Sequence, residues 1–291
     1  MKPAFVAEVS SNHNGNLKRS LAFIETAARI GCSAVKFQLF RIEELFAPEV
    51  LARKRELRER KKWELPLEFL PRLSDYARAL SIEFGCTPFY LDAVGELLPY
   101  VDFYKIASYE LLWTDLLKET AKTGKPVILS TGMATLEEIR SSLDVLRFAG
   151  AKNVTLLHCV SSYPAPPEQC NLSAIETMRN HFNCPVGWSD HSVSEAVIYS
   201  SILSYGASVV EFHLDIDDRG VEHGFAHNWL PADMKRVIDN VKTASLAAGT
   251  GEKRPADAEI VEREWRADPS DGLRPFKHIR KTLSDDIPEL D

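Results

Sequence analysis

Eight short apolar segments recur along the chain, and they constrain its fold more than any other feature. Turn-forming residues bound each segment, and several are apolar almost throughout, as strands buried on both faces of a sheet are. The segments span residues 4–10, 33–40, 82–89, 103–108, 126–132, 154–161, 185–191 and 209–216. With 291 residues the chain is long enough to bury all eight in one large core. We therefore predict that they are the strands of a single sheet.

Amphipathic stretches separate most of these segments and predict helices. They span residues 17–30, 68–79, 91–98, 111–123, 136–149, 192–205 and 232–247. Glycines stand where helix C-caps are expected, just before the next strand, at Gly31, Gly124, Gly150 and Gly206. The alternation predicts an α/β fold, a (β/α)8 TIM barrel in a single domain. A doubly wound open sheet is the alternative, but the number of repeats and the absence of a GxGxxG turn favour the barrel.

Two regions interrupt the alternation. Residues 41–66 include the charged run KRELRERKKWELP, which is typical of a solvated helix or of a lid over a charged substrate. Residues 251–291 are rich in charge and proline. We expect residues 1–250 to form the barrel domain, and residues 251–291 to form a C-terminal tail that wraps the barrel or mediates assembly.

Composition excludes several classes of partner. The net charge of -7 argues against a general nucleic-acid surface. No apolar run reaches the roughly 18 residues that a membrane span needs, and the N-terminus lacks the apolar core of a signal peptide. The five cysteines contain no CxxC pair, which favours reduced thiols. We expect a cytoplasmic protein without nucleic-acid or membrane partners.

Residues 185–215 contain two histidines that follow neighbouring predicted strands. His191 ends one apolar segment and His213 lies at the end of the next. If the strands are adjacent and parallel, the two imidazoles can hold one divalent metal and leave positions open for water and substrate. Mn²⁺ or Mg²⁺ suits a site completed by oxygen ligands. The alternative is that each histidine is a hydrogen-bonded part of the core.

Two lysines, Lys36 and Lys105, interrupt otherwise apolar strands. A buried lysine is costly unless it is paired. Either the two pair with buried carboxylates such as Glu8 and Glu211, or they neutralise an anionic ligand. Small hydroxyls suited to phosphate and carboxylate oxygens are expected at the same strand ends, namely Thr87, Ser108, Ser130 and Ser189. These residues predict a small ligand with two or three negative charges.

The same segments resemble the N-acetylneuraminate (sialic acid) synthase family. The resemblance spans residues 4–215 and rests on AEVSSNHNG, AVKFQLF, CTPF, YKIAS, PVILSTGMAT, LLHCVSSYP, GWSDH and VVEFH, in the family's order. It implies a TIM barrel that condenses phosphoenolpyruvate with an open-chain N-acyl hexosamine such as N-acetylmannosamine. The implied products are a nonulosonic acid and phosphate. The resemblance also implies a homodimer and a bound Mn²⁺ ion.

The resemblance assigns roles to individual residues. It implies that His191 and His213 hold the metal and that Glu8, Lys36 and Lys105 are catalytic. The implied phosphoenolpyruvate pocket consists of Lys36, Thr87, Lys105, Ser108, Ser130 and Ser189, and the implied sugar contacts are Glu8, Gln38 and Tyr163.

This chain departs from the family pattern at three positions. Ser161 stands where the family commonly has an asparagine near the phosphate, and Phe212 where an arginine is common. Glu222 stands in place of an aspartate that contacts the sugar. An antifreeze-like C-terminal domain, which in the family lends an arginine to a neighbouring active site, is not expected here.

Three functions follow from these patterns. The first is a metal-dependent nonulosonate synthase. The second is a related phosphoenolpyruvate aldol synthase that uses a different or phosphorylated aldose. The third is a noncatalytic sugar-phosphate-binding subunit of a polysaccharide pathway. The two histidines and two lysines favour an enzyme.

Overall fold

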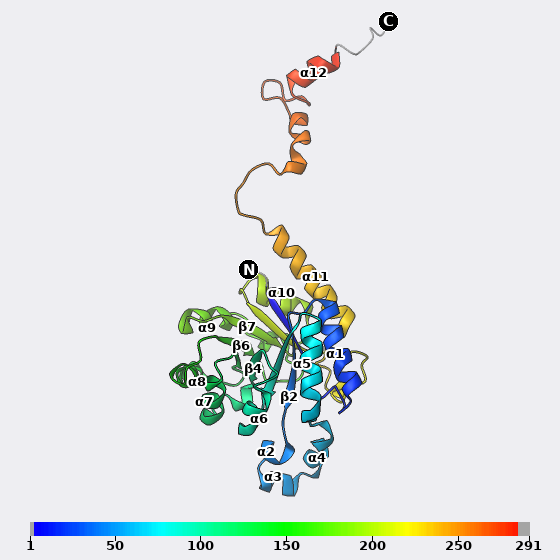
Figure 1. Cartoon of the computed structure of the whole chain (residues 1–291). Helices are drawn as coiled ribbons and strands as arrows, with labels where there is room; N and C mark the ends of the chain where they lie inside the picture. The colour runs from blue at the N-terminus through cyan, green and yellow to red at the C-terminus, as the bar shows by residue number, and fades with distance from the viewer. Residues whose placement is uncertain (1–2, 285–291) are drawn as a thin grey trace. The chain divides into compact units, whose positions relative to one another are not determined.

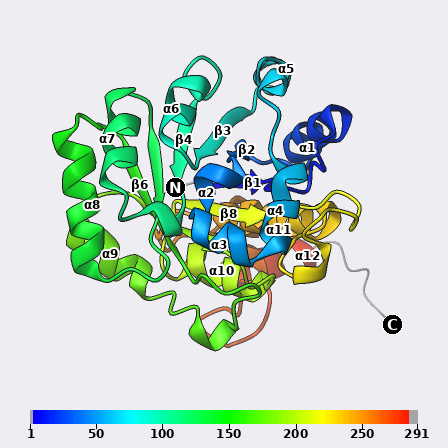
Figure 2. The same cartoon turned by 90° about the horizontal axis from the view of Figure 1, so that it is seen from below.

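The eight apolar segments form a closed parallel barrel in a computed structural model that describes residues 3–284 (Figures 1 and 2). The strands follow one another around the barrel in chain order, and β1 closes it by pairing with β8. Their bounds are β1 Ala4–Glu8, β2 Ala34–Leu39, β3 Glu83–Pro88, β4 Phe103–Ile106, β5 Val127–Ser130, β6 Val154–Cys159, β7 Val186–Asp190 and β8 Val209–His213. The predicted TIM barrel is therefore confirmed.

Helices surround the barrel and pack their apolar stripes on the outer face of the strands (Figure 2). They are α1 Leu17–Ile30, α5 Leu70–Ala79, α6 Leu91–Leu97, α7 Thr114–Lys122, α8 Leu136–Phe148, α9 Ala174–Phe182, α10 Glu195–Leu203 and α11 Pro231–Ala247. The sequence analysis omitted α9. Its signal was present, because Ile175, Met178 and Phe182 recur at helical spacing and are buried.

Two successive layers of side chains in the barrel interior differ in polarity. Near the amino ends of the strands, Val6, Ala34 and Phe103 form a separate apolar cluster with Ile128 and Val209 packed against it. Side chains two positions further along a strand point to the same face. The next layer therefore consists of Glu8, Lys36, Lys105, Ser130 and Glu211, and all five are buried. The period-2 pattern thus stacks a charged layer directly on an apolar one.

The opposite face of each strand belongs to the helix layer. On β8, Glu211 and His213 share the inner face, whereas Phe212 alternates to the outer face and joins the main core. Phe212 is fully buried there. The residue that departs from the family pattern at this position is therefore a packing residue, and its aromatic ring does not enter the barrel interior.

Glycine allows the close approach of the barrel strands at the apolar layer. A Cβ added at Gly85 of β3 would lie 2.2 Å from the Phe103 ring, and one at Gly187 of β7 would lie 2.2 Å from the Val209 carbonyl oxygen. A side chain at either position would displace a neighbour that has no free space to enter.

Residues 41–66 fold as a string of short helices between β2 and α5. These are α2 Ile42–Leu45, α3 Pro48–Arg53, α4 Arg55–Arg58 and the 3-10 helix η1 Glu59–Trp63. The Glu64 carboxylate accepts a hydrogen bond from the Ile42 amide at 2.8 Å, which ties the two ends of the segment together.

The chain divides into two compact units, Met1–Ser245 and Leu246–Asp291. The described part of the second unit contains η6 Asp257–Glu259, η7 Val261–Trp265 and α12 Lys277–Ser284. Its assignment as a tail that mediates assembly stays a prediction. A search of the described residues found no helix with the length and apolarity that a bilayer crossing requires.

Candidate active site

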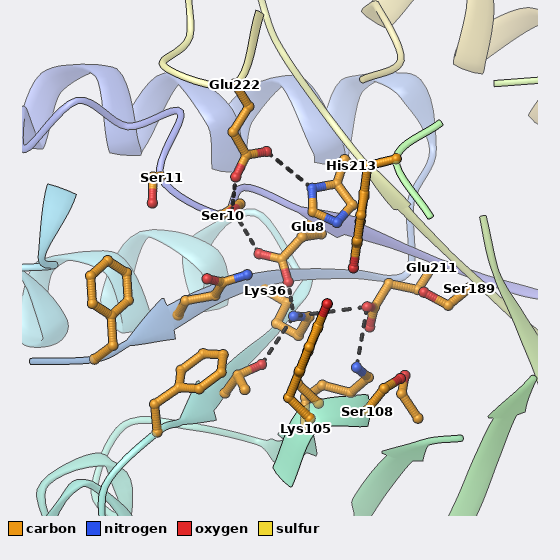
Figure 3. A pocket seen from close by; sticks show the side chains of 18 of the residues that line it. Glu8, Ser10, Ser11, Lys36, Lys105, Ser108, Ser189, Glu211, His213 and Glu222 are labelled. Atoms are coloured by element: carbon orange, nitrogen blue, oxygen red, sulfur yellow. Dashed lines mark hydrogen bonds and ion pairs between the residues drawn. The ribbon is translucent and has the colours of Figure 1, made fainter. Parts of the chain in front are cut away.

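The carboxyl ends of the strands surround a pocket of about 350 Å³, hereafter the pocket (Figure 3). The predicted site residues that line it are Glu8, Lys36, Gln38, Thr87, Lys105, Ser108, Ser130, Tyr163, Ser189, His191, His213 and Glu222. The loops after the strands and residues 41–66 complete its wall. The barrel thus brings together side chains from all eight strands or the loops that follow them.

The floor of the pocket holds a buried network of two lysines and two glutamates. Lys36 forms an ion pair with Glu8, and its Nζ lies 3.9 Å from Glu211 Oε1. Lys105 Nζ lies 3.4 Å from the same Glu211 oxygen. All four side chains are at most 5% exposed. The lysines are therefore paired with carboxylates in this structure, which was the first of the two alternatives, and an anionic ligand for them remains a prediction.

Burial shifts the proton equilibria of this network. Burial disfavours the ammonium ion of Lys36 and lowers its pKa to about 8, although Glu211 opposes the effect. Burial also opposes ionisation of Glu211, but Lys105 and Lys36 together outweigh it and lower the pKa of that carboxyl group. Lys36 also donates a hydrogen bond to Thr87 Oγ1 at 3.0 Å. The floor therefore contains charges that hold one another in place.

Small hydroxyls lie beside this floor, as predicted. Ser108 Oγ accepts a hydrogen bond from the Gly132 amide at 3.0 Å. A Cβ on Gly132 would lie 2.3 Å from Ser161 Oγ and 2.9 Å from Ser108 Oγ, so glycine leaves room for both hydroxyls. Ser161 itself is not among the residues that line the pocket, and its buried Oγ has no hydrogen-bond partner in the described part of the chain. Its predicted contact with substrate stays a prediction.

The two predicted metal ligands lie side by side at one edge of the pocket. The ring centroids of His191 and His213 are 5.5 Å apart, and the Tyr163 ring lies 4.2 Å from that of His191. His191 Nδ1 donates a hydrogen bond to the Val160 carbonyl at 2.7 Å, which leaves Nε2 as the atom available to a ligand. Burial lowers the pKa of His191 to about 3, so the ring is neutral at physiological pH.

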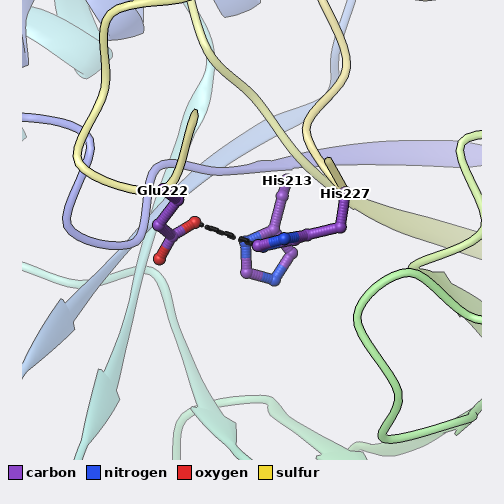
Figure 4. Close-up of side chains that lie close together, drawn as sticks. All are labelled: His213, Glu222 and His227. Atoms are coloured by element: carbon purple, nitrogen blue, oxygen red, sulfur yellow. Dashed lines mark hydrogen bonds and ion pairs between the residues drawn. The ribbon is translucent and has the colours of Figure 1, made fainter. Parts of the chain in front are cut away.

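The loop after β8 adds a carboxylate and a third histidine (Figure 4). Glu222 Oε2 lies 3.1 Å from His213 Nδ1 and 3.3 Å from His227 Nε2. The potential ligand atoms of these three residues all lie within 4.8 Å of one another. Burial raises the pKa of the Glu222 carboxyl group, but hydrogen bonds from the two histidines outweigh that effect and lower it. Two imidazoles and a carboxylate are a donor set that binds divalent metals.

His227 was not predicted to belong to the site. The chain after β8 makes an excursion and returns, and the Trp229 amide donates to the His213 carbonyl at 2.8 Å. This return places His227 beside His213, with ring centroids 4.5 Å apart. The histidine in GFAHNWLP was visible in the sequence, but no periodic pattern predicts where an irregular loop returns.

Two buried polar side chains hold that loop in place. Asp190 accepts hydrogen bonds from the indole N–H groups of Trp188, at 3.0 Å, and Trp229, at 2.9 Å. Asn12 donates to the Leu214 carbonyl at 3.1 Å and accepts from the Glu222 amide at 3.0 Å. The ends of β1 and β7 therefore fix the residues that carry Glu222 and His227.

Comparison with known proteins identifies the family. The model of the NeuB family matches residues 23–253. The chain belongs to the NeuB family. It is 34% identical to an N,N'-diacetyllegionaminic acid synthase of Campylobacter jejuni over 89% of this chain and 81% of that protein. It is 31% identical to a pseudaminic acid synthase of Helicobacter pylori over 91% of this chain and 81% of that protein.

A solved structure supports the same assignment. The N-acetylneuraminic acid synthetase of Leptospira borgpetersenii, crystallised with citrate, superposes with a TM-score of 0.80 at 29% identity. The match covers 92% of this chain and 93% of that one. The resemblance seen in the sequence motifs is therefore confirmed, and the three relatives described above are named as synthases of legionaminic, pseudaminic and N-acetylneuraminic acid.

His13 lies close to the site in sequence but does not line the pocket. It is fully buried, its Nδ1 accepts a hydrogen bond from the Gly15 amide at 3.0 Å, and its Nε2 has no partner in the described residues. Burial lowers its pKa from 6.5 to about 4. Because the Gly15 amide needs an unprotonated Nδ1, the fold selects the neutral ring.

We predict that His13 makes the protein less stable in mild acid. Between about pH 4 and pH 6.5 the unfolded chain binds a proton at His13 that the folded chain does not, so the free energy of unfolding falls as the pH falls. Between pH 8 and pH 5, His13 should lower the free energy of unfolding by roughly 2 kcal/mol. Urea unfolding of His13→Asn should show a correspondingly smaller loss over this range, whereas the exposed-site control His181→Asn should match the wild type. Equal pH dependence in His13→Asn and the wild type would contradict the assignment.

Proposed function

We propose that this chain condenses phosphoenolpyruvate with the aldehyde of an open-chain N-acyl hexosamine, forming a nonulosonic acid and releasing phosphate. The observation that carries the proposal is the juxtaposition of the buried Lys36–Glu8 and Lys105–Glu211 ion pairs with the His191–His213 edge in one pocket. Cations and hydroxyls suit the phosphate and carboxylate, and the imidazole edge suits a metal beside the aldehyde. The family's synthases support this substrate class.

The bond changes in the proposed reaction balance without a redox partner. C3 of the enol attacks the aldehyde carbon, and the aldehyde oxygen gains a proton and becomes a hydroxyl. Water adds at C2 of the former enol, and the resulting tetrahedral carbon expels phosphate by breaking its bond to the bridging oxygen. C2, which carries the carboxylate, thereby becomes the carbon of a ketone. Phosphate and carboxylate remain charged throughout, so fixed cations stabilise them at every stage.

Each residue of the pocket floor has a proposed part in these steps. Lys36 and Lys105 bind the anionic end of phosphoenolpyruvate, with Thr87, Ser108, Ser130 and Ser189 donating hydrogen bonds to its oxygens. Glu211 lies within ion-pair distance of both lysines and favours the charged form of Lys36. Glu8, held by Lys36 and by the Ser10 amide at 2.6 Å, is the proposed acceptor for a proton of the attacking water. Gln38 and Tyr163 are proposed contacts for sugar hydroxyls.

The imidazole edge fits a divalent metal. The rings of His191 and His213 are neutral, and the ligand atoms of His213, Glu222 and His227 converge. We propose that His191 and His213 bind Mn²⁺ and that Glu222 and His227 contribute further ligand atoms. A bound divalent ion would polarise the aldehyde oxygen and offset the negative charge of the substrates. Under this proposal Glu222 contacts the metal as well as the sugar.

Phosphate release tests the function. With phosphoenolpyruvate and Mn²⁺, release should require an added aldose and should be fastest with N-acyl hexosamines, because the carbon–carbon bond must form before phosphate leaves. Mass spectrometry of the mixture should find a product equal to the two substrates plus water minus phosphoric acid. Release that never depends on an acceptor, with any divalent metal, would refute the synthase.

Removal of a histidine tests the metal site. His213→Ala should lower Mn²⁺ affinity by more than about 100-fold, because it removes a ligand and leaves Glu222 with one imidazole fewer. Electron paramagnetic resonance titration of free Mn²⁺ measures this directly. His181→Ala changes an exposed histidine of α9 and should bind Mn²⁺ as the wild type does. Stoichiometric tight Mn²⁺ in His213→Ala would show that the metal lies elsewhere.

A further inference from the structure

The part of the pocket wall formed by residues 41–66 is mostly apolar. The residues of this segment that line the pocket are Ile42, Leu45, Trp63 and Arg60, and Phe40 and Phe89, which belong to the same apolar cluster, line it as well. Phe40, Ile42 and Leu51 form a buried cluster of their own, against which Leu45 and Trp63 pack. The charged run therefore has an ordered apolar side, and that side faces the pocket.

This wall lies across the barrel from His191, whereas His213, the other histidine proposed to bind the metal, ends β8 and is two strands from β2. Residues 41–66 follow β2, and in an eight-stranded barrel with strands in chain order β2 and β3 are opposite β6 and β7. His191 ends β7. An acceptor whose aldehyde lies at the imidazole edge would extend its substituents towards this wall.

Arg60 is the one charged residue that residues 41–66 contribute to the pocket lining. Its guanidinium carbon lies 5.5 Å from the centroid of the Trp63 ring, and among the described residues it has no carboxylate partner. Other cations of this segment, such as Arg58 and Lys62, also have no ion pair among the described residues, but Arg60 is the one that lines the pocket. Arg60 therefore has its N–H donors available to a ligand.

The combination of apolar walls and one planar donor matches an uncharged acyl group. A methyl group can pack on the aromatic rings while the adjacent carbonyl oxygen accepts from the guanidinium. A phosphate would bring about two negative charges to a wall that offers a single unpaired cation, and phosphate sites usually provide several donors. We infer that Arg60 and Trp63 form the subsite for the N-acyl group of the acceptor, and so select amino sugars that carry one. This inference rests on the proposed function.

Kinetics with paired acceptors test the subsite. Arg60→Ala should raise the KM for N-acetylmannosamine by about 10- to 100-fold, which is the usual range for a hydrogen bond to a charged group. The KM for mannose, which has a hydroxyl in place of the acetamido group, and the KM for phosphoenolpyruvate should not change. Arg60→Lys should recover only part of the loss, because lysine keeps the charge but not the planar donor pair. Arg58→Ala is the matched control, since Arg58 is an exposed arginine of the same segment outside the pocket lining.

Binding of an unreactive acceptor separates this inference from the proposed function. Calorimetry with the alditol of N-acetylmannosamine needs no turnover, and Arg60→Ala should weaken its binding while Arg58→Ala should not. Equal losses for N-acetylmannosamine and mannose would refute the acyl subsite even if the enzyme is a synthase. A loss confined to a phosphorylated aldose would also refute it and would assign Arg60 to an anion. If the wild type shows no acceptor-dependent turnover, the proposed function is refuted. The alditol titration would still decide whether Arg60 binds the acyl group.

Discussion

The ion pairs that join Lys36 and Lys105 to Glu8 and Glu211 are the interaction on which the rest of the site depends. All four charges are buried, and a buried charge without a partner costs free energy. Removing one of them would therefore leave its partner unpaired in a low-dielectric interior. The apolar layer of Val6, Ala34 and Phe103 fills the barrel interior directly below these charges. A charged layer held at one end of a rigid sheet gives the pocket fixed cations, and pre-positioned charge is what a phosphate-releasing reaction requires.

The fold was predictable because its determinants are local and periodic. Parallel strands buried on both faces must be apolar, and eight such runs alternating with helices leave few topologies. The omission of α9 and the incomplete account of residues 41–66 have different causes. The α9 pattern was present and overlooked, whereas the short helices after β2 are held by contacts such as Glu64 to Ile42, which connect residues far apart in the sequence.

The same distinction applies to the site. Lys36, Lys105, His191 and His213 were predictable because alternation along a strand decides which side chains enter the barrel interior. His227 and Arg60 were not, because each sits in an irregular loop whose path depends on tertiary contacts. Sequence also left open whether the lysines face carboxylates or a ligand. The structure shows carboxylates within ion-pair distance, and in the proposed function those carboxylates hold the lysines in position for a substrate anion.

In the proposed function this charged layer binds phosphoenolpyruvate. The most direct test is the affinity of the Lys105→Met protein for phosphoenolpyruvate. Calorimetry at pH 7 should show at least a tenfold weaker affinity, roughly 1.4 kcal/mol, because one of two fixed cations is lost. Lys105→Met combined with Glu211→Gln, which removes the unpaired carboxylate as well, should remain weaker than the wild type. The exposed control Lys118→Met on α7 should bind normally. Unchanged affinity in a folded Lys105→Met protein would contradict the account.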